Sequence, residues 1–288
     1  MALNEKALMA LDIPPVRTTY DWRDSVLYAL GLGYGDDPID PRQLRFVTEE
    51  EQQAMPAMAN VLGHDGSWMR DAATGIDYLR VVHGEQSMHI RHPLPVSGEI
   101  IARTTIEEVV DKGEGKGALV TARREIEDAR TGLHYATIRM TIFCRGAGGF
   151  GGKSESHRKP HPQPDSPPAR SVTVATPRQL ALIYRLSGDY NPLHSRPETA
   201  AKAGFERPIL HGLATFGIAC RALMQEFCAS EAEAVKGLEG RFSAPVYPGE
   251  TVTIDIWPQQ PGVAAFSARV GSRDVLKNGR FEFDAQEA

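Results

Sequence analysis

An aspartate and a histidine stand five residues apart in a polar stretch of the chain. Asp189 and His194 enclose the dipeptide Asn191-Pro192. Side chains at this spacing do not share one helix face, and Pro192 prevents a helix from continuing here. We expect a turn that directs both side chains to one point, where a carboxylate and an imidazole can share a water molecule as acid and base. The alternative is an aspartate that stabilises a turn beside an unrelated surface histidine.

Two predicted helices flank this stretch and must position it. Thr176, Pro177 and Gln179 resemble a capping box, so one helix is expected from there to about Leu186. The other is expected to open at Pro208, because apolar residues follow it at spacings of three and four. Its remaining residues are mostly Gly and Ala, which predicts that this helix is deeply buried.

Alternation with a period of two predicts strands in both halves of the chain. The expected strands cover residues 135–144, 252–256, 262–270 and 275–283. Within the last of these, Asn278-Gly279 gives a turn signal. A buried helix wrapped by an antiparallel sheet, occurring twice, gives an α+β fold.

Residues 145–170 differ in composition from the rest of the chain. They contain five Gly, five Pro and three Ser but no Leu, Ile, Val or Met, so we interpret them as a surface linker. The expected division is residues 1–144, this linker, and residues 171–288. VLYALG parallels LIYRLS at an offset of 156, and PLPVSGEII parallels APVYPGETV at an offset of 151. These matches predict a duplicated unit of about 120–140 residues.

Composition argues against several classes of protein. The net charge of −5, from 32 Lys and Arg against 37 Asp and Glu, disfavours a nucleic-acid-binding protein, which needs a basic surface. No uncharged apolar run approaches the length of about 18 residues that a membrane span requires. Cys144, Cys220 and Cys228 lie far apart, which predicts buried thiols, no disulfide framework and a cytoplasmic location.

Three motifs that suggest other chemistry fail on their context. Gly146, Gly148 and Gly151 match G-x-G-x-x-G, but no helix is predicted after them to hold a dinucleotide pyrophosphate. His89 and His92 lie in a strand-like stretch at a spacing that points them to opposite faces. No carboxylate or cysteine completes a ligand set, so no metal is expected. No G-x-S-x-G elbow is present, so a serine hydrolase has no support.

The polar stretch and its surroundings resemble a known family. Residues 184–194 read YRLSGDYNPLH and residues 211–217 read HGLATFG, which is similar to the signature of (R)-specific enoyl-CoA hydratases (hydratase 2) within the MaoC-like hot-dog family. WRDSVLYALGLG, VVHGEQSMHIRHPLP and DKGEGKGA extend the resemblance through the first half, and GRFSAPVYPGETV through the second. It implies a double hot-dog fold of the α+β class, with an antiparallel sheet wrapped around a long central helix in two tandem units.

The resemblance implies that the second unit catalyses hydration without a cofactor. Asp189 and His194 would activate a water that adds to C3 of a trans-2-enoyl-CoA and would manage the proton at C2, giving a (3R)-3-hydroxyacyl-CoA. Asn191 would orient the pair or its water. The backbone N–H of Gly212 would stabilise charge on the thioester oxygen, and close helix packing there is compatible with this role. His211 would make a structural hydrogen bond or support the site.

The first unit reads GLGYGDDPIDP where the second has its N-P-L-H signature. The resemblance implies that this unit lost catalysis and binds the acyl-CoA substrate. His83, Gly84, Lys112 and Phe242 match ligand-contacting positions, and Lys112 offers an ammonium to a CoA phosphate. The alternatives are a solvated loop lysine and a phenylalanine of the core.

Two other functions compete with the hydratase. A hot-dog thioesterase would use its carboxylate for hydrolysis at C1, and the D-x-N-P-L-H and H-G-L-x-T-F-G stretches argue against it. A catalytically silent acyl-CoA-binding protein is disfavoured by the intact Asp189 and His194 pair. Further association into a homodimer is expected from the family resemblance alone. Acyl-chain preference stays open among short, medium and steroid side chains.

Overall fold

One antiparallel sheet of ten strands organises the structure, a computed structural model that describes residues 3–285. The first half contributes β1 (Val16–Tyr20), β2 (Val81–Ile90), β3 (Gly98–Asp111), β4 (Ala118–Asp128) and β5 (His134–Cys144). The second half contributes β6 (Arg170–Ala175), β7 (Val235–Phe242), β8 (Thr251–Pro258), β9 (Val263–Val270) and β10 (Arg273–Phe283). Alternating side chains, such as the buried Ile138 and Ile142 of β5, turn one face of the sheet to the core.

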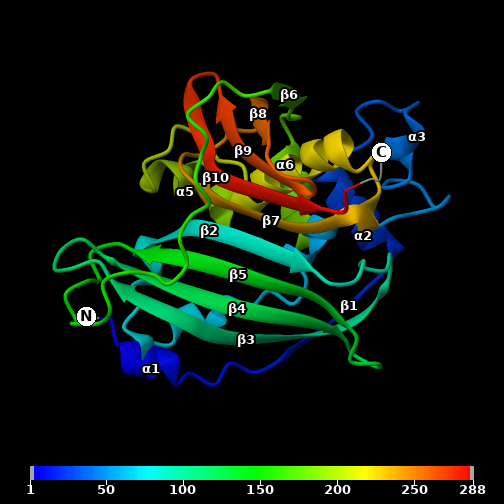
Figure 1. The fold of residues 1–288 in the computed structure, drawn as a ribbon. Helices are drawn as coiled ribbons and strands as arrows, with labels where there is room; N and C mark the ends of the chain where they lie inside the picture. Colours follow the sequence, from blue (N-terminus) through cyan, green and yellow to red (C-terminus); the bar gives the residue numbers. More distant parts are fainter. Residues whose placement is uncertain (1–2, 286–288) are drawn as a thin grey trace.

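The strand order repeats across the middle of the sheet. From one edge the strands read β1-β3-β4-β5-β2 and then β7-β10-β9-β8-β6, so each half has the same order relative to the seam between β2 and β7. The seam is antiparallel and pairs Glu85 with Arg241 at one end and His89 with Gly237 at the other. Figure 1 shows the two halves one above the other across this seam. The symmetry agrees with the duplicated unit inferred from the sequence.

The two halves differ in what packs on the inner face of the sheet. The second half uses α6 (Gly212–Phe227), in which every residue from 214 to 224 is buried. The first half has four 3₁₀ helices between α3 (Pro41–Leu44) and β2: η1 (Pro56–Asn60), η2 (Ser67–Arg70), η3 (Ala72–Thr74) and η4 (Tyr78–Arg80). The expectation of a long buried helix in both halves is therefore wrong for the described part of the first half.

Residues 3–285 also form five shorter α-helices. They are α1 (Glu5–Met9), α2 (Trp22–Leu30), α3 (Pro41–Leu44), α4 (Leu180–Tyr184) and α5 (Pro197–Lys202). Tyr28 of α2 and Tyr184 of α4 are equivalent in the sequence repeat, and their ring centroids lie 5.7 Å apart in the core. In residues 3–285, no helix is both long and apolar enough to cross a membrane.

Apolar packing joins the two halves. One cluster of buried side chains contains Ile126 of β4 together with Phe216 of α6 and Ile254 of β8. A second cluster belongs to the first half and the start of the linker, and it contains Trp68 of η2 together with Val109 of β3. The larger core is therefore shared across the seam, whereas the smaller one is not.

Local predictions fail where a side chain finds a distant partner. The capping box is not formed, because the Thr176 hydroxyl donates to the Glu250 carbonyl at 2.6 Å. Helix α4 begins instead at Leu180, with Gln179 as its N-cap and no side-chain cap bond. Asn278 makes no hairpin turn: its φ is 55° inside β10, where the register with β9 shifts and forms a bulge.

Helix α6 begins at Gly212 and not at Pro208 as predicted. The preceding residues are held in an extended segment, because the Leu210 N–H is bonded to the Val246 carbonyl at 2.7 Å. His211 becomes the N-cap with an extended ψ of 136°. This late start places the amides of the helix terminus beside the polar stretch.

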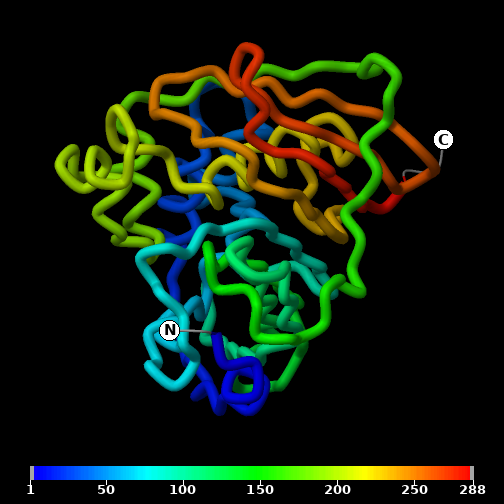
Figure 2. Tube along the Cα trace, turned by 90° about the vertical axis from the view of Figure 1, so that its left-hand side faces the viewer, coloured from blue at the N-terminus to red at the C-terminus, as the bar shows by residue number. Residues whose placement is uncertain are grey.

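Residues 145–170 pass from the lower to the upper half along the outside of the molecule (Figure 2). The start of this linker is tied down, since Asp111 accepts the Gly149 N–H at 2.7 Å and the Gly151 N–H at 2.8 Å. These bonds hold the pKa of the Asp111 carboxyl below its usual range. The G-x-G-x-x-G stretch thus wraps an anion, but the anion is a side chain of the protein itself.

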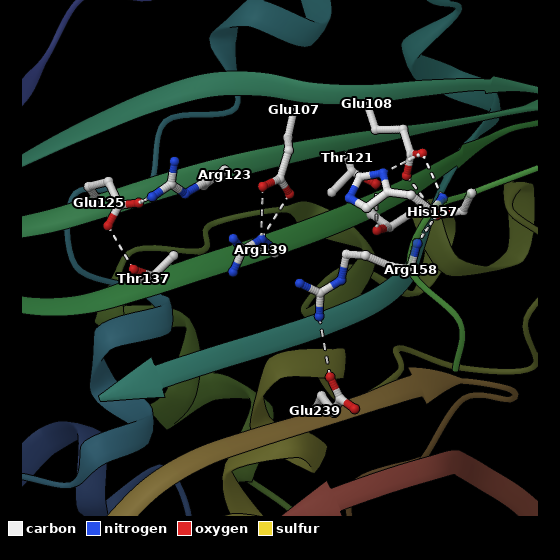
Figure 3. Close-up of polar contacts among 12 residues, drawn as sticks. Glu107, Glu108, Thr121, Arg123, Glu125, Thr137, Arg139, His157, Arg158 and Glu239 are labelled. Carbon is white, nitrogen blue, oxygen red and sulfur yellow. Dashed lines mark hydrogen bonds and ion pairs between the residues drawn. The ribbon is translucent and has the colours of Figure 1, made fainter. Parts of the chain in front are cut away.

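The middle of the linker is also bonded to the outer face of the sheet (Figure 3). Glu108 is only 4% exposed and accepts the Ser156 hydroxyl at 2.6 Å and the His157 N–H at 3.0 Å. Farther along, Arg158 pairs with Glu239 of β7 at 3.3 Å. The start of the linker packs Ala147 and Phe150 against the second apolar cluster. Its middle connects both halves through polar contacts.

Candidate active site

The turn between α4 and α5 brings the predicted pair together. Asp189 Oδ1 accepts the Asn191 N–H at 3.1 Å, and Asn191 Oδ1 accepts the Leu193 N–H at 3.0 Å. The second bond caps the 3₁₀ helix η6 (Pro192–His194), which carries His194 back toward Asp189. The aspartate that stabilises a turn and the aspartate that faces a histidine are therefore the same residue. Asn191 shapes the turn through its side-chain carbonyl.

A gap separates the two side chains of the pair. His194 Nε2 and Asp189 Oδ2 lie 4.0 Å apart, which is too far for a direct hydrogen bond and suits a bridging water. His194 is buried at 8% exposure, whereas the Asp189 side chain is 43% exposed. The gap therefore opens toward solvent on the aspartate side.

The protonation of His194 follows from its other partner. His194 Nδ1 lies 2.9 Å from the Ile209 carbonyl, which can only accept, so Nδ1 carries the proton. Burial lowers the pKa of His194 below its ordinary value. The ring is consequently neutral near pH 7, with an Nε2 lone pair available on the side of Asp189.

His211 supports this arrangement from the N-terminus of α6. Its ring stacks on that of His194 with centroids 3.7 Å apart, and its Nε2 donates to the Asp189 carbonyl at 3.1 Å. Burial, reinforced by the neighbouring His194, lowers the pKa of His211 to about 4. A neutral His211 thus contacts both members of the pair. The two alternatives for His211, a structural hydrogen bond and support of the site, are met by the same contact.

The three residues also raise the question of a metal ion. Asp189, His194 and His211 each offer a ligand atom, and these atoms lie within 4.8 Å of one another. One nitrogen of each histidine is already bonded to a backbone carbonyl. The stacked rings direct the remaining nitrogens along nearly parallel planes, whereas a tetrahedral ion needs ligands that converge. The arrangement suits a shared water better, and a metal-free site remains a prediction.

Gly212 is the first residue of α6 and faces Phe242. A Cβ at Gly212 would lie 3.1 Å from the Phe242 ring, so only glycine leaves this contact relaxed. Among the described residues, no backbone carbonyl accepts the Gly212 N–H. The amide is therefore available to an acceptor outside the protein at the positive end of a 16-residue helix.

Three of the residues predicted to bind substrate lie close together, His83 and Gly84 from β2 and Phe242 from β7. The His83 and Phe242 ring centroids lie 4.6 Å apart, and His83 Nε2 lies 2.9 Å from Gln86 Oε1. Burial lowers the pKa of His83 to about 4, while the nearby charge of Asp189 opposes this shift. The register of β2 shifts at Gly84, and this bulge redirects the His83 side chain. His83 and Phe242 therefore border the space in front of Asp189.

Lys112 is the one predicted site residue that lies apart. It follows the end of β3 and lines an open cavity of about 600 Å³ with Lys116, Phe143 and Ser154. Strand pairing places the last residue of β3 level with Cys144 at the end of β5. Cys144 in turn pairs with Val81 of β2, close to His83, so Lys112 and His83 lie at the same end of the sheet. The structure thus places Lys112 at the same end of the sheet as His83 but not at the Asp189 and His194 pair, and its role in binding stays a prediction.

Sequence reasoning missed two polar residues of the first half. His64 feels the charges of His83 and Asp189, and Arg124 Nη1 lies 2.9 Å from His64 Nδ1. His64 follows a loop glycine and Arg124 occupies an ordinary strand position, so neither spacing nor motif distinguishes them. Only the inward direction of alternate β4 side chains could have drawn attention to Arg124.

Comparison with known proteins places this chain in a family. Residues 158–274 match the family model described as a MaoC like domain, and residues 18–146 match the MFE-2 hydratase 2 N-terminal domain. The chain is 39% identical over 266 residues to enoyl-CoA hydratase ChsH3 of Mycobacterium tuberculosis, with 89% of this chain and 90% of that protein covered. It is 37% identical over 270 residues to peroxisomal enoyl-CoA hydratase 2 of Arabidopsis thaliana, with 88% and 87% covered.

Solved structures show the same fold. A MaoC-like dehydratase from Phytophthora capsici superposes with a TM-score of 0.87 at 31% identity, covering 99% of this chain and 100% of that one. A Mycobacterium tuberculosis protein described as a double hotdog fold gives a TM-score of 0.55 at 15% identity, over 94% and 93% of the two chains. The predicted double hot-dog fold is confirmed. The chain belongs to the MaoC-like hydratase 2 family.

Proposed function

We propose that this chain is an (R)-specific enoyl-CoA hydratase, a hydro-lyase that reversibly adds water to trans-2-enoyl-CoA and forms (3R)-3-hydroxyacyl-CoA. Two of its relatives are named enoyl-CoA hydratases. At the site, the supporting observation is the 4.0 Å gap between His194 Nε2 and Asp189 Oδ2. At this separation one water molecule, the co-substrate of the reaction, can hydrogen-bond to both atoms from the side.

Asp189 and His194 act on this water as a unit. The water oxygen bonds to C3 while the pair takes one water proton and delivers a proton to C2, so the C2–C3 double bond becomes a single bond. His194 enters with a free Nε2 lone pair, because Nδ1 is bonded to the Ile209 carbonyl. The two groups exchange protons through one water, so acid and base are not divided between them.

The Gly212 amide is the proposed oxyanion donor. Addition at C3 moves the double-bond electrons toward the thioester oxygen before C2 is protonated. A donor that is preorganised for this oxygen lowers the barrier more than one that must reorient. The Gly212 N–H lies at the start of α6 beside Phe242, and no backbone carbonyl of the described residues accepts it.

The first half is proposed to bind the acyl-CoA. Its inner face carries short 3₁₀ helices where the second half has α6, and His83 and Phe242 border the space in front of the pair. Lys112 and Lys116 line a separate cavity at the same end of the sheet, where two ammonium groups suit a CoA phosphate. We also propose that residues 145–170 are the linker between this substrate-binding unit, residues 1–144, and the catalytic unit, residues 171–288.

The remaining expectations concern cofactor, location and assembly. We propose catalysis without metal or cofactor, because an acid/base pair and an oxyanion donor supply every step. Full activity after dialysis against a chelator would support this, and loss restored by a divalent metal would contradict it.

The three free and buried cysteines support a reducing, cytoplasmic location. A homodimer rests on family resemblance, and light scattering of the purified protein tests it.

The decisive assay uses crotonyl-CoA and a longer trans-2-enoyl-CoA. We expect loss of the enoyl thioester absorbance without release of free thiol, and a product that a (3R)-specific hydroxyacyl-CoA dehydrogenase oxidises. Release of thiol would instead indicate a thioesterase. Binding of both thioesters without either signal would indicate a silent acyl-CoA-binding protein.

A further inference from the structure

Arg124 is a buried cation on the inner face of β4. The residue is 6% exposed, and burial lowers the pKa of its guanidinium to about 10. Its Nη2 donates to the Asn60 carbonyl at 2.6 Å and its Nη1 lies 2.9 Å from His64 Nδ1. Its Nε is buried, and no protein group of residues 3–285 accepts its proton. A guanidinium with unused donors is placed to receive an acceptor from outside the protein.

Arg124 also lacks an anion to balance its charge. In the described part of the chain, no carboxylate lies within ion-pair distance of it, whereas the other deeply buried arginine, Arg221, pairs with Asp36 at 2.6 Å. Asp65 borders the same cavity, but its carboxylate accepts the N–H and the hydroxyl of Ser67 at 2.8 and 2.7 Å. A buried charge without a counter-ion destabilises the folded state unless a ligand of opposite charge pairs with it.

His64 connects this cation with the active site. Burial, together with the Arg124 charge, lowers the pKa of His64 to about 4, although the residue is exposed to solvent. His83 and Asp189 also act on the pKa of His64, so His64 lies within electrostatic reach of the Asp189 side of the site while it contacts Arg124. Because His64 Nδ1 accepts from Arg124, its Nε2–H is free to donate.

The distance along the sheet indicates which part of a substrate reaches Arg124. Arg124 pairs with Ile138, which pairs with Met88 on β2, five residues beyond His83. That offset is about 17 Å along the strand and about 10 Å across two strands. The thioester reacts near His83, so the far end of an extended acyl chain reaches Arg124.

The cavity beside Arg124 is small and mixed in character. It measures about 10 Å³, room for one water-sized group such as a single carboxylate oxygen. Trp68, Ile138 and Met140 form apolar walls, and Arg124 and His64 supply donors. This combination suits the polar terminus of an otherwise apolar chain.

We propose that the enzyme accepts enoyl-CoA substrates whose acyl chain ends in a carboxylate, and that Arg124 and His64 bind this terminal carboxylate. The inference rests on the proposed hydratase function and names the substrate class of the same site. A carboxylate supplies the missing counter-ion, and the planar guanidinium offers it paired N–H donors. The competing role for Arg124 is structural only: its bond to the Asn60 carbonyl would hold the end of η1.

The test compares two trans-2-enoyl-CoA substrates of equal chain length, one ending in a methyl group and one in a carboxylate. The readout is the ratio of their kcat/KM values. We expect the native enzyme to favour the carboxylate and Arg124→Met to reduce this ratio about 10- to 100-fold, the range of one charge-assisted hydrogen bond. The matched control is Arg123→Met, one residue earlier on β4, whose side chain pairs with Glu125. This control should keep the native ratio.

The other outcomes are equally definite. A native ratio that favours the methyl terminus overturns the inference while leaving the hydratase function intact, and so does a ratio that Arg124→Met does not change. Failure to hydrate either substrate overturns both proposals. If Arg124→Met does not fold, as judged by circular dichroism, His64→Gln at an exposed residue replaces it. That variant should reduce the same ratio about tenfold, and an unchanged ratio contradicts the proposal.

Discussion

The two halves of the sheet carry the same five strands in the same order, yet their inner faces hold different elements. In the second half, α6 fills the space, and its N-terminus meets Asp189 and His194. In the first half, the inner face carries short 3₁₀ helices and includes the polar contact between His64 and Arg124. The duplicated scaffold thus has one inner face filled by α6, beside the proposed catalytic pair, and one inner face covered by short helices, where we propose that the substrate binds.

The acidic residues show the same contrast. Asp189 lies on a turn and faces His194 across a gap. Asp36, in the first-half loop where the N-P-L-H signature is missing, pairs instead with Arg221 of α6 at 2.6 Å. One carboxyl is therefore free for chemistry, whereas the other joins the first half to the central helix of the second. Changes at the two positions should have separable consequences.

The largest expected effect comes from the pair itself. Asp189→Asn retains an Oδ1 that accepts the Asn191 N–H, so the turn should persist. Both Asp189→Asn and His194→Gln should lower kcat about 10³-fold, the range of general acid–base catalysis. Stopped assays at high enzyme concentration measure this, and retained substrate binding checks the fold. Near-native rates in either variant would exclude that residue from catalysis.

The next largest effect is expected at the start of α6. In Gly212→Ala the new Cβ would lie 3.1 Å from the Phe242 ring and would displace either the ring or the amide. We expect kcat/KM to fall about 10²-fold, as when an oxyanion donor is misplaced. The control is Gly240→Ala, where the nearest atom lies at 3.8 Å. Equal losses in both variants would point to general damage of β7.

Asp36 should matter for stability and not for catalysis. Asp36→Ala removes the partner of the buried Arg221, but Asp36 is itself half exposed, so we expect the free energy of unfolding to fall by about 1 kcal/mol. Denaturant unfolding measures this, with Asp37→Ala as the neighbouring control. A loss of kcat without a loss of stability would mean that the first-half acid still takes part in the chemistry.

The pH dependence follows from the neutral state of His194. Burial lowers its pKa, so protonation removes the Nε2 lone pair only at a pH below the ordinary histidine value of about 6.5. The acid limb of kcat/KM should therefore lie below that value, and it should move or disappear in His194→Gln. An exposed-site variant, His89→Gln, should keep the native profile. An acid limb at or above the ordinary value would contradict a buried neutral base.

Much of the fold follows from local patterns in the sequence. The pattern of apolar residues located β5, β8 and β9, because each strand turns apolar side chains to the core. It did not predict that residues of the opposite face, such as Asp255 and Ser267, are buried as well. The start of α6 did not follow, because the Leu210 N–H is bonded to Val246, which lies 36 residues away. The cap at Thr176 failed for the same reason, since its hydroxyl is bonded to Glu250. Local propensity fails to predict where a helix begins when a long-range hydrogen bond holds the same residues in another conformation.

The candidate site divides in the same way. Asp189 and His194 were predictable because their turn is encoded within six residues. His64 and Arg124 were not, since they meet only when β4 pairs with its neighbours and a loop folds over them. The G-x-G-x-x-G stretch was predicted only in part. Its backbone amides do bind an anion, but that anion is the side chain of Asp111 at the end of β3.

The core shared across the seam has a consequence for inherited variation. Ile126 from the half proposed to bind substrate and Phe216 from the half proposed to be catalytic belong to one cluster of buried side chains. Neither half therefore keeps its packing if the other unfolds. A substitution such as Ile126→Thr, remote from the reacting atoms, lowers the folded fraction of the whole chain, and cellular proteases remove the remainder. Loss-of-function alleles should therefore occur in both halves, with reduced protein abundance as their common sign.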